Sequence, residues 1–367
     1  MIELAPKHIL ISQQIEADIR QGRWGDGRLP GVRTLAQEYG TSVVTASRAL
    51  QNLVNRGLID TVERSGCFVR SAAPSDKIET TETWGVCLRL TAGPWRQGTE
   101  AVVRGGFTAL ARREGYLFRD DLFPDPNLPE SRLTQLALEA KATGVGGLFY
   151  LPARVSEAAA RLDEVLLRAC AAAKFPVVLL ERNLRGNRPL THDLIGNEDL
   201  EAGRTLTRHL IEAGRQRPAC VVGSPTSSHQ ARLAGYLLAV YEAGVTPCVI
   251  EQPIDAPLKD AYAAVVNQAM AARADAIVCY QDYTAIGVIV ELLNRGRRVP
   301  ADVAVTGFED LPIGSTFSIG VTTYAFSYEQ MARRAVQVMK DRIQNPTAAP
   351  VRVAVGGQLI VRESSGR

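Results

Sequence analysis

The feature that most constrains this chain is an alternation of short apolar runs with amphipathic helical stretches beyond residue 83. The runs are rich in Val, Ile and Leu and lie at residues 86–88, 147–151, 177–180, 219–222, 276–279 and 303–306. A helical stretch after each apolar run is typical of βαβ units around a parallel sheet. This many strands exceed what one small doubly wound domain holds. We therefore expect an α/β region of two lobes with parallel sheets and a cleft between them.

The first 70 residues have a different pattern, which predicts a small helical domain that ends in a hairpin. Gly40 is expected to end one helix, and Thr41 or Ser42 to cap the next. The hairpin is expected to turn at Ser65 and Gly66. The expected helices and hairpin cover residues 11–19, 32–39, 42–55 and 58–70.

A polar stretch that contains Pro74 separates the two regions, and its composition is typical of a linker. The sequence therefore predicts a winged helix-turn-helix domain over residues 1–70, a linker over 71–83 and a two-lobed α/β domain over 84–367.

The composition excludes several classes of protein. The net charge of +3 is too small to indicate nucleic-acid binding without support from the placement of charges. The chain has no readable signal peptide and no apolar run long enough to cross a membrane, so we expect a cytoplasmic protein without a membrane partner. Six cysteines and four histidines are dispersed without metal-ligand spacing. The glycines at 144–147 lack the Lys of a phosphate loop, so no metal, cofactor or catalytic residue is expected.

Residues 32–55 have the form of a helix-turn-helix, whose second helix divides into two faces. Its apolar face comprises Ala46, Leu50, Leu53 and Val54. The side chains expected on the opposite face are Ser42, Thr45, Arg48, Asn52 and Asn55. A helix of this kind buries one face and presents the other to a DNA major groove. The predicted DNA contacts are Arg33, Ser42, Thr45, Ser47 and Arg48, with Arg64 at the tip of the hairpin. An interaction domain that binds another protein is the alternative.

This region resembles the GntR, or gluconate-repressor, family of winged helix-turn-helix domains. The motifs that carry the resemblance are IRQGRWGDGRLPGVRTLA at 19–36, TSVVTASRAL at 41–50, LVNRGLI at 53–59 and GCFV at 66–69. The resemblance implies that Arg33 and Arg48 touch DNA. The hairpin departs from the family's Gly-x-Gly-Thr, and Gly31 replaces the usual Ser before the first helix, which weakens the cap there.

In the second region, polar and charged residues directly follow several predicted strands. Ligands of α/β domains bind at the carboxyl ends of the strands. Carboxylates and Arg bind vicinal hydroxyls, and Trp stacks on a sugar ring, so the set suits a polyol. The predicted effector contacts are Trp95, Arg182, Arg232, Gln281, Asp282 and Asp310.

The second region resembles the LacI/GalR effector domain, which is similar to periplasmic sugar-binding proteins, from about residue 84 to 366. The motifs that carry the resemblance include EDLEAG at 198–203, QARLAGY at 230–236, AIVCYQDYTAIG at 276–287 and VPADVAVTGFED at 299–310. The resemblance implies effector contacts by Arg232 and Asp282, with Trp95 and Arg182 at positions that often touch ligand. Departures at Gln281, at residues 198–199 and at Glu309 change side-chain length, which points away from a common hexose.

Together the two regions predict a transcriptional regulator, a repressor in the first instance, and not an enzyme. We expect a homodimer that binds a pseudo-palindromic operator and a small sugar-like effector. The alternatives are a sugar-binding protein without a DNA role, a sugar-acting enzyme with Asp282 and Asp310 as an acid/base pair, and an activator.

Overall fold

The structure is a computed structural model that describes residues 7–20, 23–24, 28–55, 59–62, 66–69, 82–88, 98–123, 125, 128–153, 157–186, 188–223 and 226–366. The chain divides into two compact units, Met1–Glu79 and Thr80–Arg367. The strand β3 (Thr83–Leu88) begins at the last residue of the predicted linker.

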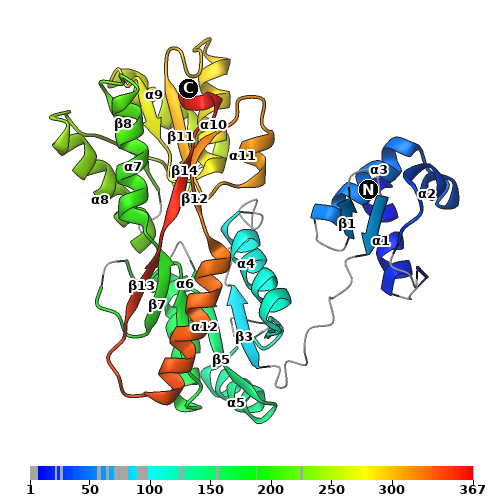
Figure 1. Ribbon diagram of the computed structural model, residues 1–367. Helices are drawn as coiled ribbons and strands as arrows, with labels where there is room; N and C mark the ends of the chain where they lie inside the picture. Colours follow the sequence, from blue (N-terminus) through cyan, green and yellow to red (C-terminus); the bar gives the residue numbers. More distant parts are fainter. Residues whose placement is uncertain are drawn as a thin grey trace. The chain divides into compact units, whose positions relative to one another are not determined.

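The first unit is a helix-turn-helix followed by a two-stranded hairpin (Figure 1). Its elements are α1 (Lys7–Arg20), α2 (Val32–Glu38), α3 (Val43–Asn55), β1 (Ile59–Val62) and β2 (Gly66–Val69). β1 and β2 pair antiparallel, with Ile59 opposite Val69. Ile15, Leu35 and Leu53 lie fully buried among these elements. The helices and the hairpin predicted from sequence are therefore confirmed, although part of the predicted turn, residues 63–65, lies outside the described residues.

The turn between α2 and α3 depends on Gly40, which has a φ of +57°. Glycine adopts this left-handed conformation without steric cost, so it ends α2 as the sequence predicts. Ser42 then caps α3, because the Thr45 amide donates a hydrogen bond to Ser42 Oγ at 3.1 Å. Gly31 precedes α2 and provides no side-chain cap, as expected.

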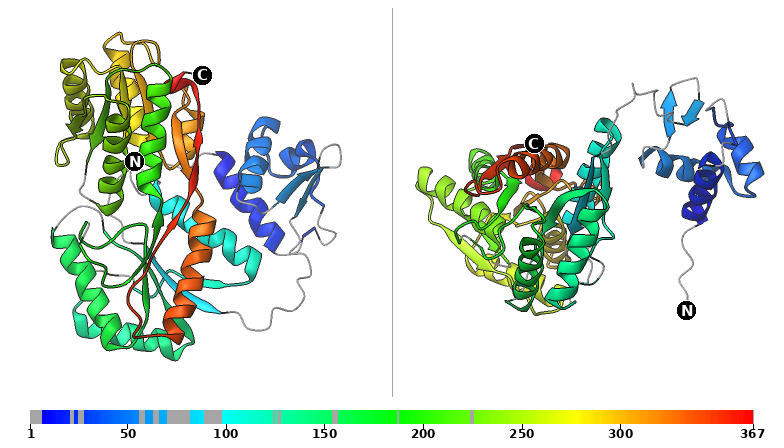
Figure 2. Two further views of the ribbon diagram at one scale, coloured as in Figure 1. Left: turned by 60° about the vertical axis from the view of Figure 1, so that its left-hand side comes forward. Right: turned by 90° about the horizontal axis from the view of Figure 1, so that it is seen from below.

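The second unit contains two six-stranded sheets, one in each lobe (Figures 1 and 2). In the N-lobe the strand order is β13-β7-β6-β5-β3-β4, and the described pairings are all parallel. In the C-lobe the order is β14-β12-β11-β10-β8-β9, in which β14 runs antiparallel to β12. Each lobe has helices on both faces of its sheet, so the predicted two-lobed α/β fold is confirmed.

The strands and helices of the N-lobe follow the expected alternation. Its strands are β3, β4 (Leu117–Arg119), β5 (Val145–Leu151), β6 (Val177–Leu180), β7 (Asp193–Asn197) and β13 (Arg352–Val355). Its helices are α4 (Thr99–Glu114), α5 (Glu130–Ala142), α6 (Glu157–Ala172) and α12 (Tyr328–Gln344). One apolar cluster lies between the sheet and the pair α4 and α12, and a second lies under α5 and α6.

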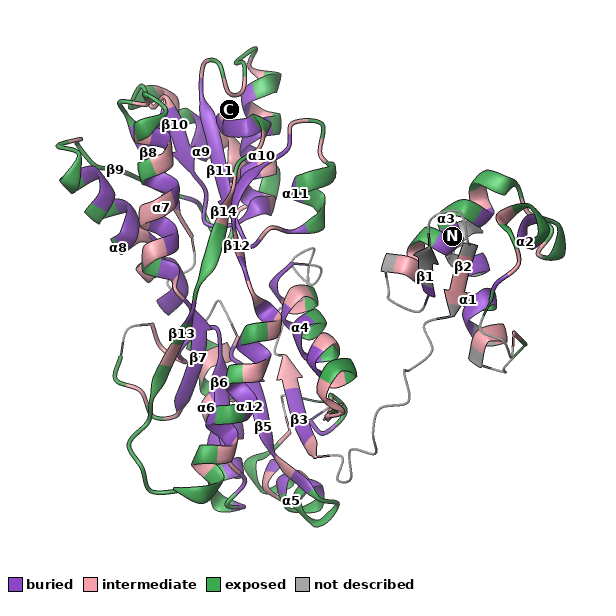
Figure 3. Cartoon of the chain, in the orientation of Figure 1, coloured by how far each residue is buried: buried purple, intermediate pink, exposed green. Residues whose placement is uncertain are grey.

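The C-lobe has the same organisation. Its strands are β8 (Pro218–Val222), β9 (Cys248–Glu251), β10 (Ala276–Val278), β11 (Ala304–Phe308), β12 (Thr322–Phe326) and β14 (Gly357–Ile360). Its helices are α7 (Asp199–Glu212), α8 (Ser227–Glu242), α9 (Leu258–Ala271), α10 (Asp282–Asn294), the short α11 (Pro312–Thr316) and the 3-10 turn η2 (Glu363–Ser365). Each apolar run predicted as a strand is a strand or overlaps one, and β6, β10 and β11 are buried along their whole length (Figure 3).

The chain passes between the lobes where β7 leads into α7, where β12 leads into α12 and where β13 leads into β14. Figure 2 shows the last crossing as the red strand that runs from one lobe to the other. These crossings place the carboxyl ends of β7 and β12 at the junction of the lobes. Residues that follow the strands of both sheets can therefore meet there.

Candidate functional site

The first candidate site is the outer face of α3 in the helix-turn-helix. Its buried side chains are Ala46, Ala49, Leu50 and Leu53. Its exposed side chains are Val43, Val44, Ser47, Arg48 and Gln51. The predicted apolar face is confirmed in the main, but Asn52 and Val54 lie half-buried at its edge, and Gln51 takes the exposed position expected for Asn52.

The predicted DNA contacts that the structure describes lie on α2, α3 and the turn between them. Ser47 and Arg48 are exposed on α3, and Arg33 is exposed near the start of α2. The hydroxyl groups of Ser42 and Thr45 lie 2.8 Å apart and form part of the cap of α3. Arg64 lies outside the described residues. A helix N-terminus with nearby cations and hydroxyl groups suits phosphate and base contacts, and the individual contacts stay predictions.

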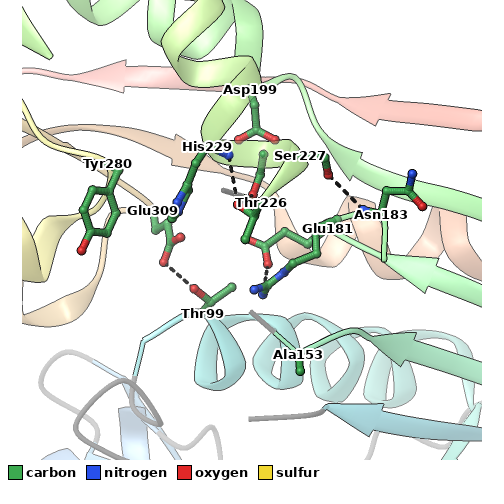
Figure 4. Close-up of polar contacts among 12 residues, drawn as sticks. Thr99, Ala153, Glu181, Asn183, Asp199, Thr226, Ser227, His229, Tyr280 and Glu309 are labelled. Carbon is green, nitrogen blue, oxygen red and sulfur yellow. Dashed lines mark hydrogen bonds and ion pairs between the residues drawn. The ribbon is translucent and has the colours of Figure 1, made fainter. Parts of the chain in front are cut away.

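The second candidate site is a buried polar cluster between the lobes, which we call the inter-lobe cluster. Its members follow strands β6, β7, β8, β10 and β11 or begin α4: Thr99, Glu181, Arg182, Asn183, Asp199, Ser227, Arg232, Tyr280 and Glu309. Figure 4 shows side chains from both lobes converging on this position. Strand ends of two parallel sheets meet here, as the fold requires of an α/β ligand site.

Arg232, in the second turn of α8, is the centre of the cluster. Its Nε donates to Asp199 Oδ1 at 2.8 Å, and its Nη1 donates to the Tyr280 carbonyl at 2.6 Å. Nη1 also lies 3.7 Å from Glu309 Oε1. The guanidinium carbon lies 4.6 Å from the centre of the Phe308 ring. These contacts fix a buried cation in one orientation.

Two hydrogen bonds join the lobes directly within the cluster. Thr99 Oγ1, on α4 of the N-lobe, donates to Glu309 Oε2 at 2.9 Å. The backbone N–H of Asn183, which follows β6 of the N-lobe, donates to Ser227 Oγ on α8 at 2.9 Å. Both can be followed in Figure 4. Each bond joins one lobe to the other. A ligand that replaces these bonds therefore changes how the two lobes are held together.

Burial dominates the electrostatics of the cluster. It raises the pKa of Asp199 to about 7, although the neighbouring Arg232 acts in the opposite direction. Burial by itself would lower the pKa of Arg232, but Asp199 and Glu309 raise it above its ordinary value. Arg232 therefore stays charged, and its carboxylate partners offset the cost of burying it.

Several buried polar atoms of the described residues here have no hydrogen-bond partner. They are Asn197 Oδ1 and Nδ2, Asp199 Oδ2, Arg232 Nη2 and Tyr328 Oη. Asn197 ends β7 two residues before Asp199, and Tyr328 begins α12 at the next crossing between lobes. Buried donors and acceptors without partners cost free energy, and a ligand with several hydroxyl groups would satisfy both kinds.

The structure distributes the predicted effector residues among different positions. It brings Arg182 and Arg232 into the inter-lobe cluster. Gln281 is buried at the N-cap of α10. Asp310 instead forms an ion pair of 2.6 Å with Arg362 in the C-lobe. Trp95 lies outside the described residues.

Asp282 is fully buried, and its Oδ2 accepts a hydrogen bond of 2.8 Å from the Leu311 amide. It thereby holds the loop that carries Glu309. Burial raises the pKa of Asp282 to about 8. In this structure Asp282 positions the loop of Glu309 through the Leu311 amide. A direct contact between Asp282 and an effector stays a prediction.

The sequence argument noted Glu181, Asp199 and Glu309 in or beside strand-end motifs but did not include them among the predicted effector contacts. It also missed Thr99, which no predicted strand precedes closely. The carboxylates could have been predicted from the sequence. A buried Arg that follows a strand needs an acidic partner, and these acidic residues follow neighbouring strands.

A pocket of about 640 Å³ lies elsewhere on the N-lobe, at the amino end of β6, and includes Lys174, Pro176 and Val177 in its lining. The ligand position of α/β domains is instead at the opposite, carboxyl ends of the strands. The inter-lobe cluster, where buried polar groups converge, is therefore the candidate ligand site.

Comparison with known proteins finds a family match in each of the two units. The family described as "Bacterial regulatory proteins, gntR family" matches residues 10–69, and the "Periplasmic binding protein-like domain" family matches residues 207–365. The HTH-type transcriptional repressor PurR of Photobacterium profundum is 24% identical over 349 residues, which cover 92% of this chain and 96% of the relative. The arabinose metabolism transcriptional repressor of Geobacillus stearothermophilus is 23% identical over 370 residues, 98% of each chain.

Solved structures show the same fold. A transcriptional regulator CelR–cellobiose complex aligns with a TM-score of 0.61 at 21% identity, and covers 92% of this chain and 100% of that chain. A LacI-family transcriptional regulator from Enterococcus faecium with bound ribose aligns with a TM-score of 0.58 at 16% identity, over 78% of this chain and 99% of that chain.

The fold and the comparisons define a transcriptional regulator that joins a GntR-type helix-turn-helix domain to a two-lobed α/β domain. More particularly, residues 10–69 match the gntR family of bacterial regulatory proteins and residues 207–365 match the periplasmic binding protein-like domain, and the two-lobed unit has the fold of solved LacI-family regulators. No described helix is long and apolar enough to cross a membrane.

Proposed function

We propose that this regulator is a repressor whose affinity for operator DNA changes when a small sugar-like molecule binds between the two lobes. The observation that carries the proposal is the inter-lobe cluster, in which buried charges and hydroxyl groups from both lobes converge on Arg232. A binding event at this position acts on both lobes at once, which an effector must do.

The chemistry of the cluster favours a ligand with several hydroxyl groups. Carboxylate and guanidinium groups bind vicinal hydroxyls in pairs, and the buried atoms without partners include donors and acceptors. Relatives support this class, since one is named for arabinose metabolism and solved neighbours contain cellobiose and ribose.

The helix-turn-helix is proposed to bind DNA through Ser47 and Arg48 of α3, with Ser42 and Thr45 at its start, Arg33 on α2 and Arg64 at the wing. A homodimer would place two such units on the half-sites of a pseudo-palindromic operator. Three exposed apolar side chains support an interface on the C-lobe: Val249 on β9, Ile254 in the loop after it and Leu258 at the start of α9. A regulator of this kind acts where the DNA is, in the cytoplasm.

The proposed mechanism is a shift between two arrangements of the lobes. In one arrangement Thr99 bonds Glu309 and Asn183 bonds Ser227, and the operator-binding state is favoured. The sugar replaces these bonds and favours the other arrangement by its differential affinity. A coupling of about 1–3 kcal/mol corresponds to a change of about 5- to 150-fold in operator affinity.

The proposed function has no catalytic step. Asp310 is engaged by Arg362, and Asp282 is engaged by the Leu311 amide, so neither carboxylate is presented as an acid or a base for a sugar. A sugar-binding protein without a DNA role would leave the GntR-type domain without a function.

The test is binding of the full chain to the DNA upstream of its own gene, at one stated salt concentration, with and without a panel of pentoses, hexoses, disaccharides and purines. We expect specific binding that one sugar weakens by at least fivefold. Specific binding that only a purine changes would overturn the sugar assignment. The absence of specific binding at moderate salt would overturn the regulator itself.

A further inference from the structure

The outer face of α3 contains a feature that the predicted DNA contacts do not explain. Val44 is 63% exposed, and Val43 beside it is 46% exposed. Valine is a poor helix former because its branched side chain loses rotamer freedom. An exposed valine also gains nothing from burial. Folding of the isolated domain would be served better by Ala at this position.

The position of Val44 on the helix is informative. The exposed residues Val44, Ser47, Arg48 and Gln51 are spaced i, i+3, i+4 and i+7, so they form one stripe. The buried residues Ala46, Ala49, Leu50 and Leu53 have the same spacing, offset by two positions. An offset of two residues is about 200° around a helix, so the stripe lies opposite the core. Val44 is its first residue.

The geometry points to Val44 as a base-reading residue that packs against the 5-methyl group of a thymine in each operator half-site. The inference rests on the proposed DNA-binding role of α3 and adds to it a residue and a base. The N-terminal residues of a recognition helix are those that reach base edges in the major groove. Thymine is the base that presents a methyl group there, and apolar side chains recognise it by contact.

The stripe also predicts where the thymine lies. Val44 and Arg48 are one helical turn apart, about 6 Å along the axis of α3. Base pairs are stacked at about 3.4 Å, so this distance spans about two steps. We expect the thymine within about two base pairs of the base or phosphate that Arg48 contacts.

The experiment removes the methyl group from the DNA and the side chain from the protein in turn. Operator DNA is selected with the full chain from a random-sequence library, and each thymine of one half-site is replaced singly by deoxyuridine. Affinities are measured at fixed salt for the wild type and for Val44→Ala, Val43→Ala and Arg48→Ala. Thermal unfolding of each variant confirms that the exposed substitutions leave the domain folded.

For the wild type, we expect one replacement per half-site to weaken binding about fourfold, which corresponds to one buried methyl group. Val44→Ala should bind the thymine and deoxyuridine operators equally. Val43→Ala should keep the fourfold preference, and Arg48→Ala should lose affinity for both operators while it keeps their ratio.

The inference is overturned if no single thymine matters to the wild type, or if Val44→Ala keeps the full preference. Loss of the preference in Val43→Ala alone would move the contact to the neighbouring residue and contradict the stripe. Failure of the wild type to select any sequence is a separate outcome, which would refute the DNA-binding role of α3 itself.

Discussion

At the scale of single residues, the proposed ligand site is marked by buried polar groups whose hydrogen bonds are incomplete. Tyr328 is the clearest case among the described residues, because its ring is buried and its hydroxyl group has no hydrogen-bond partner. Burial also raises the pKa of this hydroxyl well above its ordinary value, so it is a neutral donor at any working pH. A buried hydroxyl without a partner opposes folding and favours a ligand that completes it.

Tyr328→Phe should therefore raise the stability of the protein and lower its affinity for the effector. The substitution removes only the hydroxyl group, so the free energy of unfolding should rise by about 1 kcal/mol. Affinity for the effector should fall about tenfold, and operator affinity without effector should stay unchanged. Calorimetric titration and thermal unfolding measure the two effects. A variant that binds effector as tightly as the wild type would place Tyr328 outside the site.

Asp282 predicts a pH dependence of stability. Its pKa is raised to about 8 in the folded chain by burial, so the folded state binds a proton more tightly than the unfolded state does. Its contribution to stability is therefore largest at low pH and falls as the pH rises toward 8. Asp282→Asn keeps an acceptor for the Leu311 amide but cannot titrate.

We expect the stability of the wild type relative to Asp282→Asn to decrease between about pH 6 and about pH 8. Urea unfolding of both proteins at the two pH values measures the difference. An unchanged or increasing difference would show that Asp282 is ionised throughout this range in the folded chain.

At the scale of elements, the inter-lobe cluster depends on how closely α7 and α8 approach. A Cβ at Gly203 would lie 2.2 Å from the Arg232 carbonyl oxygen, and a Cβ at Gly235 would lie 2.0 Å from the Leu200 carbonyl oxygen. Both neighbours are backbone atoms, which cannot move without the helix. The two glycines therefore set the distance over which Arg232 on α8 reaches Asp199 on α7.

Gly203→Ala should separate the helices and weaken the bond between Arg232 and Asp199. We expect destabilisation of about 1–3 kcal/mol and a loss of effector affinity beyond what stability explains. Gly105→Ala on α4 is the control, because a Cβ at Gly105 meets open space and should leave stability and effector affinity unchanged. Gly214→Ala would not serve, because Gly214 has a positive φ that strains any other residue. Equal effects of the Gly203 and Gly105 variants would refute close packing as the cause.

The sequence predicted the elements that have strong apolar runs and missed those that do not. β7 is fully buried, yet it begins with Asp193 and ends with Asn197, so it lacks a continuous apolar run. The buried charge of Asp193 is compensated by Arg342 at the end of α12, which donates two hydrogen bonds of 2.8 Å to its carboxylate. The two residues are 149 positions apart, so no local sequence pattern predicts that they pair.

The same limit applies to the site. Arg182 and Arg232 could be selected because each lies after or near a strand in a recognisable motif. The bond between Thr99 and Glu309 joins residues 210 positions apart, and only the meeting of two sheets brings them together. On α3, helical spacing located the buried face but misassigned its edge, since Gln51 and not Asn52 is exposed.

At the scale of the whole molecule, the proposed assembly is a homodimer. Ile254 is 51% exposed and Leu258 is 36% exposed at the edge of the C-lobe. Ile254→Asp should shift the protein from dimer to monomer in sedimentation and lower operator affinity at least tenfold, because the half-sites are then bound independently. The unfolding midpoint of the C-lobe should change little. A variant that stays dimeric would place the interface elsewhere.

The central claim is that effector and operator are coupled through the lobes. The most direct test is calorimetric titration of the sugar into the free protein and into the protein–operator complex. Thermodynamic linkage requires that the sugar's affinity differ between the two by the same factor by which the sugar changes operator affinity. We predict a difference of at least fivefold, with weaker binding to the operator complex. Equal affinity for both forms would contradict the account, because such a ligand cannot regulate DNA binding.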